Sequence, residues 1–278
     1  MARVASLHVY PVKSCRGIDL ATSRLTPTGL EWDRRWMIVD AAGRFVTQRE
    51  NARLASIASA INGKLRLAAD GLPEFVIDLH HDGPMRKVRI WKHVGVGIDA
   101  GDEAADWLMA ALGAPYRLVR VVESEMQTVD PSYAGPGNHP VTFTDGYPIL
   151  MISRASLQDL NERLPAPLPM NRFRPNIVID DVPAYAEDAM AVFRIGKVAV
   201  RGVKPCTRCV ITTTDQVTCV RDDRQEPLRT LKTYRYDAGQ KGVAFGQNCV
   251  VEAGVGERLA VGTELTIEDR RDRRGHTP

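Results

Sequence analysis

The sequence predicts an α+β, β-rich protein with many short strands and few helices. Segments of alternating or β-branched apolar residues recur along most of the 278 residues, and turn signals separate them. Only three segments have the longer apolar spacing and the end signals of helices. The 44% of hydrophobic and 26% of charged residues are normal for a globular protein with a substantial core.

Most hairpin signals lie in the first half of the chain. Ala5, Leu7 and Val9 alternate with other residues and predict a strand before Pro11. Asn62-Gly63 favours a type I′ hairpin turn, because both positions accept φ > 0. The further strands expected in this half are Arg35–Asp40, Arg44–Gln48, Ser56–Ile61, Lys64–Ala68, Glu74–Leu79 and Val88–Trp91.

The three predicted helices have different end signals. Asp102–Leu112 has acids in its first turn and Gly113 as a stop. Arg154–Leu164 follows Ser153 as an N-cap, and Pro227–Tyr234 has proline in its first turn. The strands expected among and after them are Asn176–Ile179, Ala191–Ile195, Lys197–Val203, Phe245–Glu252 and Leu265–Glu268.

Two segments lack periodic patterns. Ser124–His139 contains Pro, Gly, Ser and Asn, and we interpret it as a domain boundary or a mobile lid. We therefore expect one domain over residues 1–120 and a second over residues 121–270. The tail Asp269–Pro278 has four arginines and no apolar anchor, so we expect disorder there, and residues 271–278 are set apart as the tail.

Charge and cysteine content exclude several classes of protein. The formal net charge of +3 is too near balance to indicate nucleic-acid binding. The N-terminus lacks the pattern of a signal peptide, and no apolar run approaches the roughly 20 residues that span a bilayer. Five cysteines are an odd number without disulfide-scaffold density, so we expect reduced thiols. Because there is neither an export signal nor a spanning segment in the sequence, we also expect no membrane association and a cytoplasmic location.

The most informative stretch is VKPCTRCVITTTDQVT, which places Cys206 and Cys209 three residues apart. Thiolates are soft ligands for zinc, iron–sulfur clusters or another soft metal. A zinc site would need Cys219, Cys249 or histidines to complete four ligands. A thioredoxin-like pair would open a helix, but Val210–Thr214 is β-branched and predicts a strand. A buried structural thiol is the remaining alternative.

Three polar clusters interrupt the strand patterns. Lys13-Ser14 follows the first strand, Arg34 lies between two tryptophans in WDRRW, and Arg174 and Asn176 lie in FRPN. Lys, Ser and exposed backbone N–H groups suit an anionic group, and Arg offers a planar fork to phosphate or carboxylate. Each cluster alone also fits a surface ion pair or an ordinary loop. Together they predict a polar anionic ligand near a thiolate.

These motifs, taken in order, resemble the MOSC-domain family, in the branch with the mitochondrial amidoxime reducing component and its bacterial relatives. The matching stretches are YPVKSCRG, WDRRW, FVTQRENARLASI, FTDGYPILMISRASLQDLN, FRPNIVI, PCTRCVITTTDQVT, EPLRTLKTYR and FGQN. The likeness covers nearly the whole chain. It implies a MOSC N-terminal β domain packed with a MOSC β-barrel-like domain that carries a few helices.

The resemblance also implies a cofactor, Mo-molybdopterin, in which a pterin dithiolene holds the molybdenum. Its protein ligand, and the catalytic residue, would be Cys209, whereas Cys206 does not occupy the ligand position. The residues that the resemblance implies at the cofactor are Lys13, Ser14, Arg34, Thr144, Asp145, Arg174, Asn176, Thr207 and Arg208.

The activity implied by the resemblance is two-electron reduction of the N–O bond of an N-hydroxylated small molecule. No cysteine follows Cys249, so we expect the electrons to come from a separate flavoprotein or ferredoxin-type protein. Asp145 and Asp215 are candidate proton donors. The alternatives are a non-catalytic carrier of molybdenum cofactor or sulfur, and a zinc-stabilised binding module.

Overall fold

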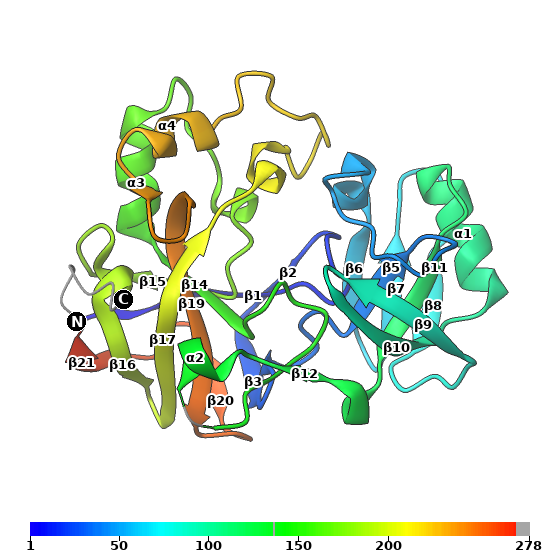
Figure 1. Cartoon of the computed structure of the whole chain (residues 1–278), viewed down its shortest axis with the longest axis horizontal. Coiled ribbons are helices and arrows are strands. Elements are labelled where there is room, and N and C mark those ends of the chain that lie inside the picture. Colours follow the sequence, from blue (N-terminus) through cyan, green and yellow to red (C-terminus); the bar gives the residue numbers. More distant parts are fainter. Residues whose placement is uncertain (136, 271–278) are drawn as a thin grey trace.

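A nine-stranded sheet joins the two ends of the chain (Figure 1). The computed structural model describes residues 1–135 and 137–270. The strand order is β2-β1-β15-β14-β19-β17-β16-β21, and β18 pairs with β19 beside it. The strands are β1 Arg3–Val9, β2 Ile18–Leu20, β14 Ile149–Ser153, β15 Ile177–Asp180, β16 Met190–Ile195, β17 Val198–Thr207, β18 Tyr236–Asp237, β19 Gly242–Ala253 and β21 Leu265–Arg270.

One pair in this sheet, β14 and β15, is parallel. Parallel strands need a crossover connection, and α3 (Arg154–Arg163) supplies it. The helix begins as predicted, because the Ser153 hydroxyl accepts a hydrogen bond from the Ser156 backbone N–H at 3.0 Å. The last predicted helix is also present, as the shorter α4 (Leu228–Lys232).

Residues from the first half of the chain form a second lobe, on the right in Figure 1. It contains a four-stranded sheet in the order β5-β11-β10-β9 and a three-stranded sheet in the order β6-β7-β8. The helix α1 (Asp102–Leu112) has the predicted bounds, and it ends at Gly113, whose φ of 75° is left-handed. The strands are β5 Trp36–Val39, β6 Ala58–Ile61, β7 Lys64–Ala68, β8 Phe75–Asp78, β9 Met85–Ile90, β10 His93–Asp99 and β11 Arg117–Val121.

The lobes have separate hydrophobic cores. Trp36, Leu54 and Leu108 belong to the core of the second lobe, whereas Leu7 and Phe193 belong to the core of the large sheet. The smaller elements are β3 Thr22–Thr26, β4 Gly29–Leu30, β20 Arg258–Ala260, β12 Gln127–Thr128, β13 Pro140–Val141, α2 Pro131–Ala134 and the 3-10 helices η1 Ala52–Ser56, η2 Glu123–Glu125, η3 Met170–Arg172, η4 Ala186–Ala189 and η5 Val210–Thr213.

The chain order and the sheet order differ at the N-terminus. β1 pairs with β15 and with β2, and β3 pairs with β20 near the C-terminus. The first thirty residues therefore hydrogen-bond with strands from the second half of the chain. The division into domains of residues 1–120 and 121–270 stays a prediction. The strand pairing of the first thirty residues crosses it.

The strand predicted at Val210–Thr214 is wrong, because the segment forms the 3-10 helix η5. The hydroxyl of Thr212 donates to the Cys209 carbonyl at 2.9 Å, and that of Thr213 donates to the Val210 carbonyl at 2.8 Å. Such local bonds from threonine offer the backbone an alternative to a ladder. The sequence argument against a thioredoxin-like cysteine pair relied on a strand after Cys209. That strand is absent, so the argument no longer holds.

Three other expectations change. Asp269 and Arg270 are not disordered, since they belong to β21 and pair with β16, and residues 271–278 lie outside the described residues. The predicted lid Ser124–His139 contains β12 and α2. The strand expected at Arg44–Gln48 is reduced to isolated bridges. Of the helices in residues 1–135 and 137–270, none is long and apolar enough to cross a membrane.

Candidate functional site

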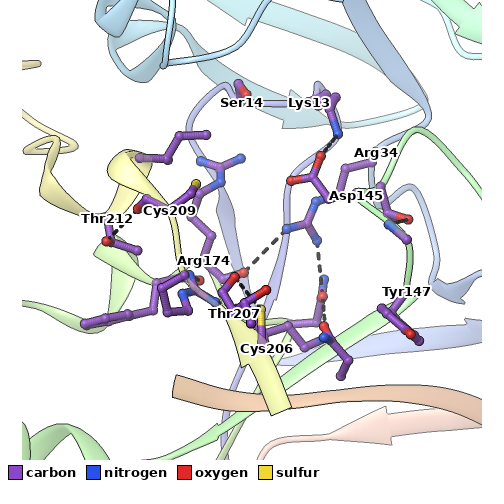
Figure 2. A pocket seen from close by; sticks show the side chains of 18 of the residues that line it. Lys13, Ser14, Arg34, Asp145, Tyr147, Arg174, Cys206, Thr207, Cys209 and Thr212 are labelled. Carbon is purple, nitrogen blue, oxygen red and sulfur yellow. Dashed lines mark hydrogen bonds and ion pairs between the residues drawn. The ribbon is translucent and has the colours of Figure 1, made fainter. Parts of the chain in front are cut away.

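A cavity of about 410 Å³ lies where the loop after β1, the loop before β14 and the end of β17 meet. Figure 2 shows Cys209 on one side of it, with Lys13, Asp145 and Arg34 on the other. Its volume is within the range of pockets that hold cofactors. All ten residues that we selected from the sequence line this cavity: Lys13, Ser14, Arg34, Thr144, Asp145, Arg174, Asn176, Thr207, Arg208 and Cys209.

Lys13 is the buried cation of the first cluster. Its ammonium donates to Asp145 Oδ1 at 2.7 Å and to the Phe143 carbonyl at 2.8 Å. Burial lowers the pKa of Lys13, against the opposing effect of Asp145. Burial alone would raise the pKa of Asp145, but the Lys13 ammonium outweighs it and the pKa falls to about 2. The Asp145 carboxyl is therefore ionised near neutral pH.

The depressed pKa of Asp145 predicts a pH dependence of stability. Its folded-state pKa of about 2 lies below the 3.8 of a free carboxyl. The pair therefore stabilises the fold fully above roughly pH 4, and this contribution is lost as the pH falls towards 2. Urea unfolding of the parent and of Asp145→Asn should differ at pH 6 and converge near pH 2. A difference that stays constant over this range would contradict the ion pair.

Arg34 and Arg174 both stack on the ring of Tyr10. Their guanidinium carbons lie 4.4 and 4.2 Å from the centre of its ring. Arg34 Nη1 donates to Asp33 Oδ2 at 2.5 Å and to Asn176 Oδ1 at 3.1 Å. Arg174 Nη1 donates to the Cys15 carbonyl at 2.7 Å, and burial lowers its pKa to about 10. The stacked cations stay fixed at the cavity wall because the aromatic face and the hydrogen bonds hold them.

Asn176 connects three strands beside the cavity. Its Oδ1 accepts from Arg34 and also from the Leu150 backbone N–H at 3.1 Å. Its Nδ2 donates to the His8 carbonyl at 3.2 Å. The side chain thus links β1, β14 and the entry to β15, so part of its role is to hold Arg34 in place.

Four of the lining residues have a strained backbone. The φ angles of Ser14, Arg34, Trp91 and Arg174 are 68°, 48°, 53° and 55°, in the left-handed region that side chains disfavour. Such residues cost roughly 1–3 kcal/mol each and collect at functional sites. The Ser14 carbonyl accepts from Gln48 Nε2 at 2.7 Å, which helps to hold its turn.

Cys206 lies at the end of β17, and Cys209 follows the strand. Thr207 is the last residue of the strand, and Cys209 precedes the first turn of η5. Arg208 donates to the Cys206 sulfur at 3.2 Å and to the Phe173 carbonyl at 2.6 Å. Thr144 also lines the cavity, and its hydroxyl accepts from the Gly146 N–H at 3.4 Å.

Sequence reasoning missed Arg49, whose Nη2 donates to the Cys209 sulfur at 3.0 Å. Its guanidinium also lies over the ring of Trp91, 4.9 Å from the centre. Both residues line the cavity. The stretch FVTQRENARLASI contains Arg49 and belonged to the resemblance, but no local pattern linked it to a cysteine 160 positions away.

The second candidate proton donor, Asp215, is outside the cavity lining. Its carboxylate accepts from the backbone N–H groups of Thr218 and Val217, and Arg172 pairs with it at 2.9 Å. The hydrogen bond from the Thr218 N–H, then that from Val217 and the charge of Arg172, lower the pKa of Asp215. Asp215 and Asp145 are both ionised at neutral pH, so neither holds a proton ready for transfer.

The cavity favours anionic ligands. Its lining contains six basic side chains, Lys13, Arg34, Arg49, Arg174, Lys204 and Arg208, and one acidic side chain, Asp145. Three buried guanidinium nitrogens in its walls, Arg49 Nη1, Arg174 Nη2 and Arg208 Nε, have no hydrogen-bond partner within the described residues. An unsatisfied buried donor costs about 1–3 kcal/mol, so an anionic group that supplies acceptors stabilises this site.

The described part of the chain has no group of three or more His, Cys, Asp or Glu side chains that could hold a metal. Cys249 is buried, and Cys219 is not part of the cavity lining. A four-ligand zinc site is therefore not formed around Cys206 and Cys209 by these residues. A metal that takes one thiolate from the protein and its other ligands from a cofactor fits this donor set.

Comparison with known proteins agrees with the motifs. Residues 1–115 match the MOSC N-terminal beta barrel domain, and residues 138–266 match the MOSC domain. Mitochondrial amidoxime-reducing component 1 of Homo sapiens is 36% identical over 266 residues, which cover 90% of this chain and 78% of the human protein. Mitochondrial amidoxime reducing component 2 of Rattus norvegicus is 37% identical over 245 residues, 84% of this chain and 72% of the rat protein.

Among solved structures, the YUAD protein from Bacillus subtilis aligns over 95% of this chain and 93% of its own length, at 11% identity. The TM-score of 0.39 is too low to add to the sequence comparison. The two domain matches and the two relatives are sufficient to assign the family. The chain therefore belongs to the family of MOSC-domain proteins with a MOSC N-terminal domain, the family of the amidoxime-reducing components.

Proposed function

We propose that this chain is a molybdenum-cofactor-dependent reductase of N-hydroxylated compounds. The observation that carries the proposal is a cavity in which two thiols, Cys206 and Cys209, share the walls with six basic side chains and one carboxylate. The names of the relatives, amidoxime-reducing components, support the same activity. The overall reaction is R–NH–OH plus two electrons and two protons giving R–NH2 and water.

Mo-molybdopterin fits the donor set of the cavity. Cys209 would be the protein ligand of the metal, since thiolates suit soft metals. Lys13, Arg34 and Arg174 would hold the phosphate by charge-assisted hydrogen bonds. When bound, the cofactor supplies the two-electron redox chemistry, as cofactors do in enzymes of this kind.

The remaining lining residues suit the ring system and its surroundings. Ser14, Thr144, Thr207 and Asn176 offer hydroxyl and amide groups, and Asp145 an acceptor, to a pterin edge rich in donors and acceptors. Arg208 would shape the wall beside the ligand cysteine, because its guanidinium is already anchored on the Phe173 carbonyl. The protein's contribution is positioning, thiolate ligation and electrostatics.

Electrons would come from a separate flavoprotein or ferredoxin-type protein. The five cysteines of the chain are Cys15, Cys206, Cys209, Cys219 and Cys249. Cys15 and Cys249 are buried in the hydrophobic cores, and no cysteine follows Cys249. An iron–sulfur cluster held by four thiolates therefore has no place in these 278 residues once Cys209 binds the molybdenum.

The test is metal content measured together with turnover. The protein is purified from a host that makes the molybdenum-pterin cofactor, and molybdenum and zinc are measured by plasma mass spectrometry. Reduction of benzamidoxime by viologen-supplied electrons is then followed by chromatography. We expect near-stoichiometric molybdenum and amidine formation. Molybdenum without turnover of amidoximes or hydroxamic acids would indicate a carrier, and zinc or no metal would overturn the cofactor assignment.

A further inference from the structure

Arg49 is a partly buried cation whose side chain donates a hydrogen bond to a sulfur atom. Its Nη2 donates to Cys209 Sγ at 3.0 Å, and within the described residues no carboxylate forms an ion pair with it. An arginine in a cavity wall ordinarily pairs with a carboxylate, as Arg34 does with Asp33 at 2.5 Å. In place of a carboxylate, the side-chain acceptor of Arg49 is the Cys209 sulfur.

The backbone of Arg49 is held from both sides. Its own turn is closed by Glu50, whose carboxylate accepts from the Thr47 backbone N–H at 2.9 Å, and by Thr47 Oγ1, which accepts from the Arg49 N–H at 3.1 Å. From the Cys209 side, Arg221 Nη2 donates to the Gln48 and Arg49 carbonyls at 2.7 and 3.3 Å. The segment is therefore attached directly to the loop that follows the cysteine.

The neighbouring Gln48 strengthens this attachment. It is fully buried, and its amide exchanges hydrogen bonds with that of Gln216 at 3.0 and 2.9 Å. It also donates to the Ser14 carbonyl at 2.7 Å. Gln48 thus ties three segments of the site together, immediately before Arg49. A rigid supporting shell is what a precisely placed ligand requires.

The guanidinium plane is restrained as well. It lies 4.9 Å from the centre of the Trp91 ring, so its orientation towards the sulfur is limited by stacking. Arg208 makes the same kind of contact with Cys206, the cysteine outside the ligand position, but shares its guanidinium with the Phe173 carbonyl. The Arg49 guanidinium therefore donates to the Cys209 sulfur, whereas that of Arg208 divides its hydrogen bonds between a sulfur and a carbonyl.

We propose that Arg49 is a positioning residue for the metal-ligating thiolate: its hydrogen bond fixes the Cys209 sulfur and withdraws electron density from it. The inference rests on the proposed function, in which Cys209 binds molybdenum. Hydrogen bonds to a ligating sulfur raise the reduction potential of the metal it binds. Removal of such an outer partner typically weakens metal retention or activity about 10–100-fold.

The experiment compares Arg49→Gln, Arg49→Lys and a matched control, Arg53→Gln. Arg53 is an exposed arginine four positions away that does not line the cavity. For each variant we would measure melting temperature, molybdenum per chain, the Mo(V) electron paramagnetic resonance spectrum and the midpoint potential by redox titration. Benzamidoxime reduction gives kcat and KM separately.

We expect Arg49→Gln to fold, to lose molybdenum or kcat about 10–100-fold, and to shift the midpoint potential of any retained metal to more negative values. Arg49→Lys keeps the charge but not the planar fork, so the midpoint potential of its metal should lie between those of the parent and of Arg49→Gln. Arg53→Gln should match the parent. Complete metal loss in a folded Arg49→Gln supports the inference, because the control retains the metal.

The inference is overturned if Arg49→Gln retains molybdenum with the parent's spectrum, potential and kcat. It is also overturned if only KM changes, since that would place Arg49 at the substrate and not at the thiolate. A parent protein that binds no molybdenum would remove the proposed function, and this inference with it. Molybdenum in the parent with unchanged Arg49 variants removes the inference alone.

Discussion

Cys209→Ala should leave the protein folded and abolish both molybdenum retention and amidoxime reduction. The side chain lies in the cavity wall at the start of η5, and its sulfur would be the protein's bond to the metal. Removing a sulfhydryl that is only partly buried should have little effect on the fold. Molybdenum per chain, measured after gel filtration, should fall to the background of the method.

Cys206→Ala is the matched comparison. Cys206 lines the same cavity three residues earlier, but its sulfur accepts from Arg208 instead of Arg49. We expect most of the molybdenum and a measurable activity to remain. Equal losses in the two variants would contradict the assignment of Cys209 as the ligand, and a loss confined to Cys206→Ala would reverse it.

Arg34→Ala should affect stability and cofactor retention together. The Asp33 side chain is completely buried and bonds to Arg34 Nη1 at 2.5 Å and to the Tyr10 backbone N–H at 2.8 Å. Leaving a buried carboxylate without its cation typically costs about 3–5 kcal/mol. The free energy of unfolding from urea titration should fall by that order, and molybdenum retention should fall with it.

A double variant separates the two effects. Asp33→Asn combined with Arg34→Ala removes the unpaired charge, so part of the stability should return while molybdenum retention stays low. Arg35→Ala is the neighbouring control, because the partner of Arg35 is Glu123, whose half-exposed carboxylate stays in contact with water when the arginine is removed. Full recovery of molybdenum in the double variant would remove Arg34 from the cofactor site.

Elements with local signals were predictable from the sequence. The helix α1 has its predicted bounds because Asp102, Glu103 and Gly113 mark its ends. The segment after Cys209 was not predictable in the same way. Its β-branched residues favour a strand, but the hydroxyls of Thr212 and Thr213 bond to nearby carbonyls and close the turns of η5.

The site itself could be predicted only in part. The polar clusters pointed to an anionic ligand, and the resemblance related them to one pocket. No property of Arg34 or Arg174 alone indicates that both stack on Tyr10. The contact between Arg49 and Cys209 is equally non-local, since it depends on how two distant turns are brought together. Contacts of this kind follow from tertiary packing, which local patterns do not encode.

The pairing of β1 with β15 has a consequence for the order of events during synthesis. Lys13 and Ser14 follow β1, but their cavity partners extend to Asn248 on β19. A ribosome therefore releases more than two hundred residues after Ser14 before the last wall of the cavity exists. Domains that emerge early fold early, yet this pocket cannot close on a nascent N-terminal half. The cofactor that we propose for this cavity would therefore bind only after these last strands have been synthesised.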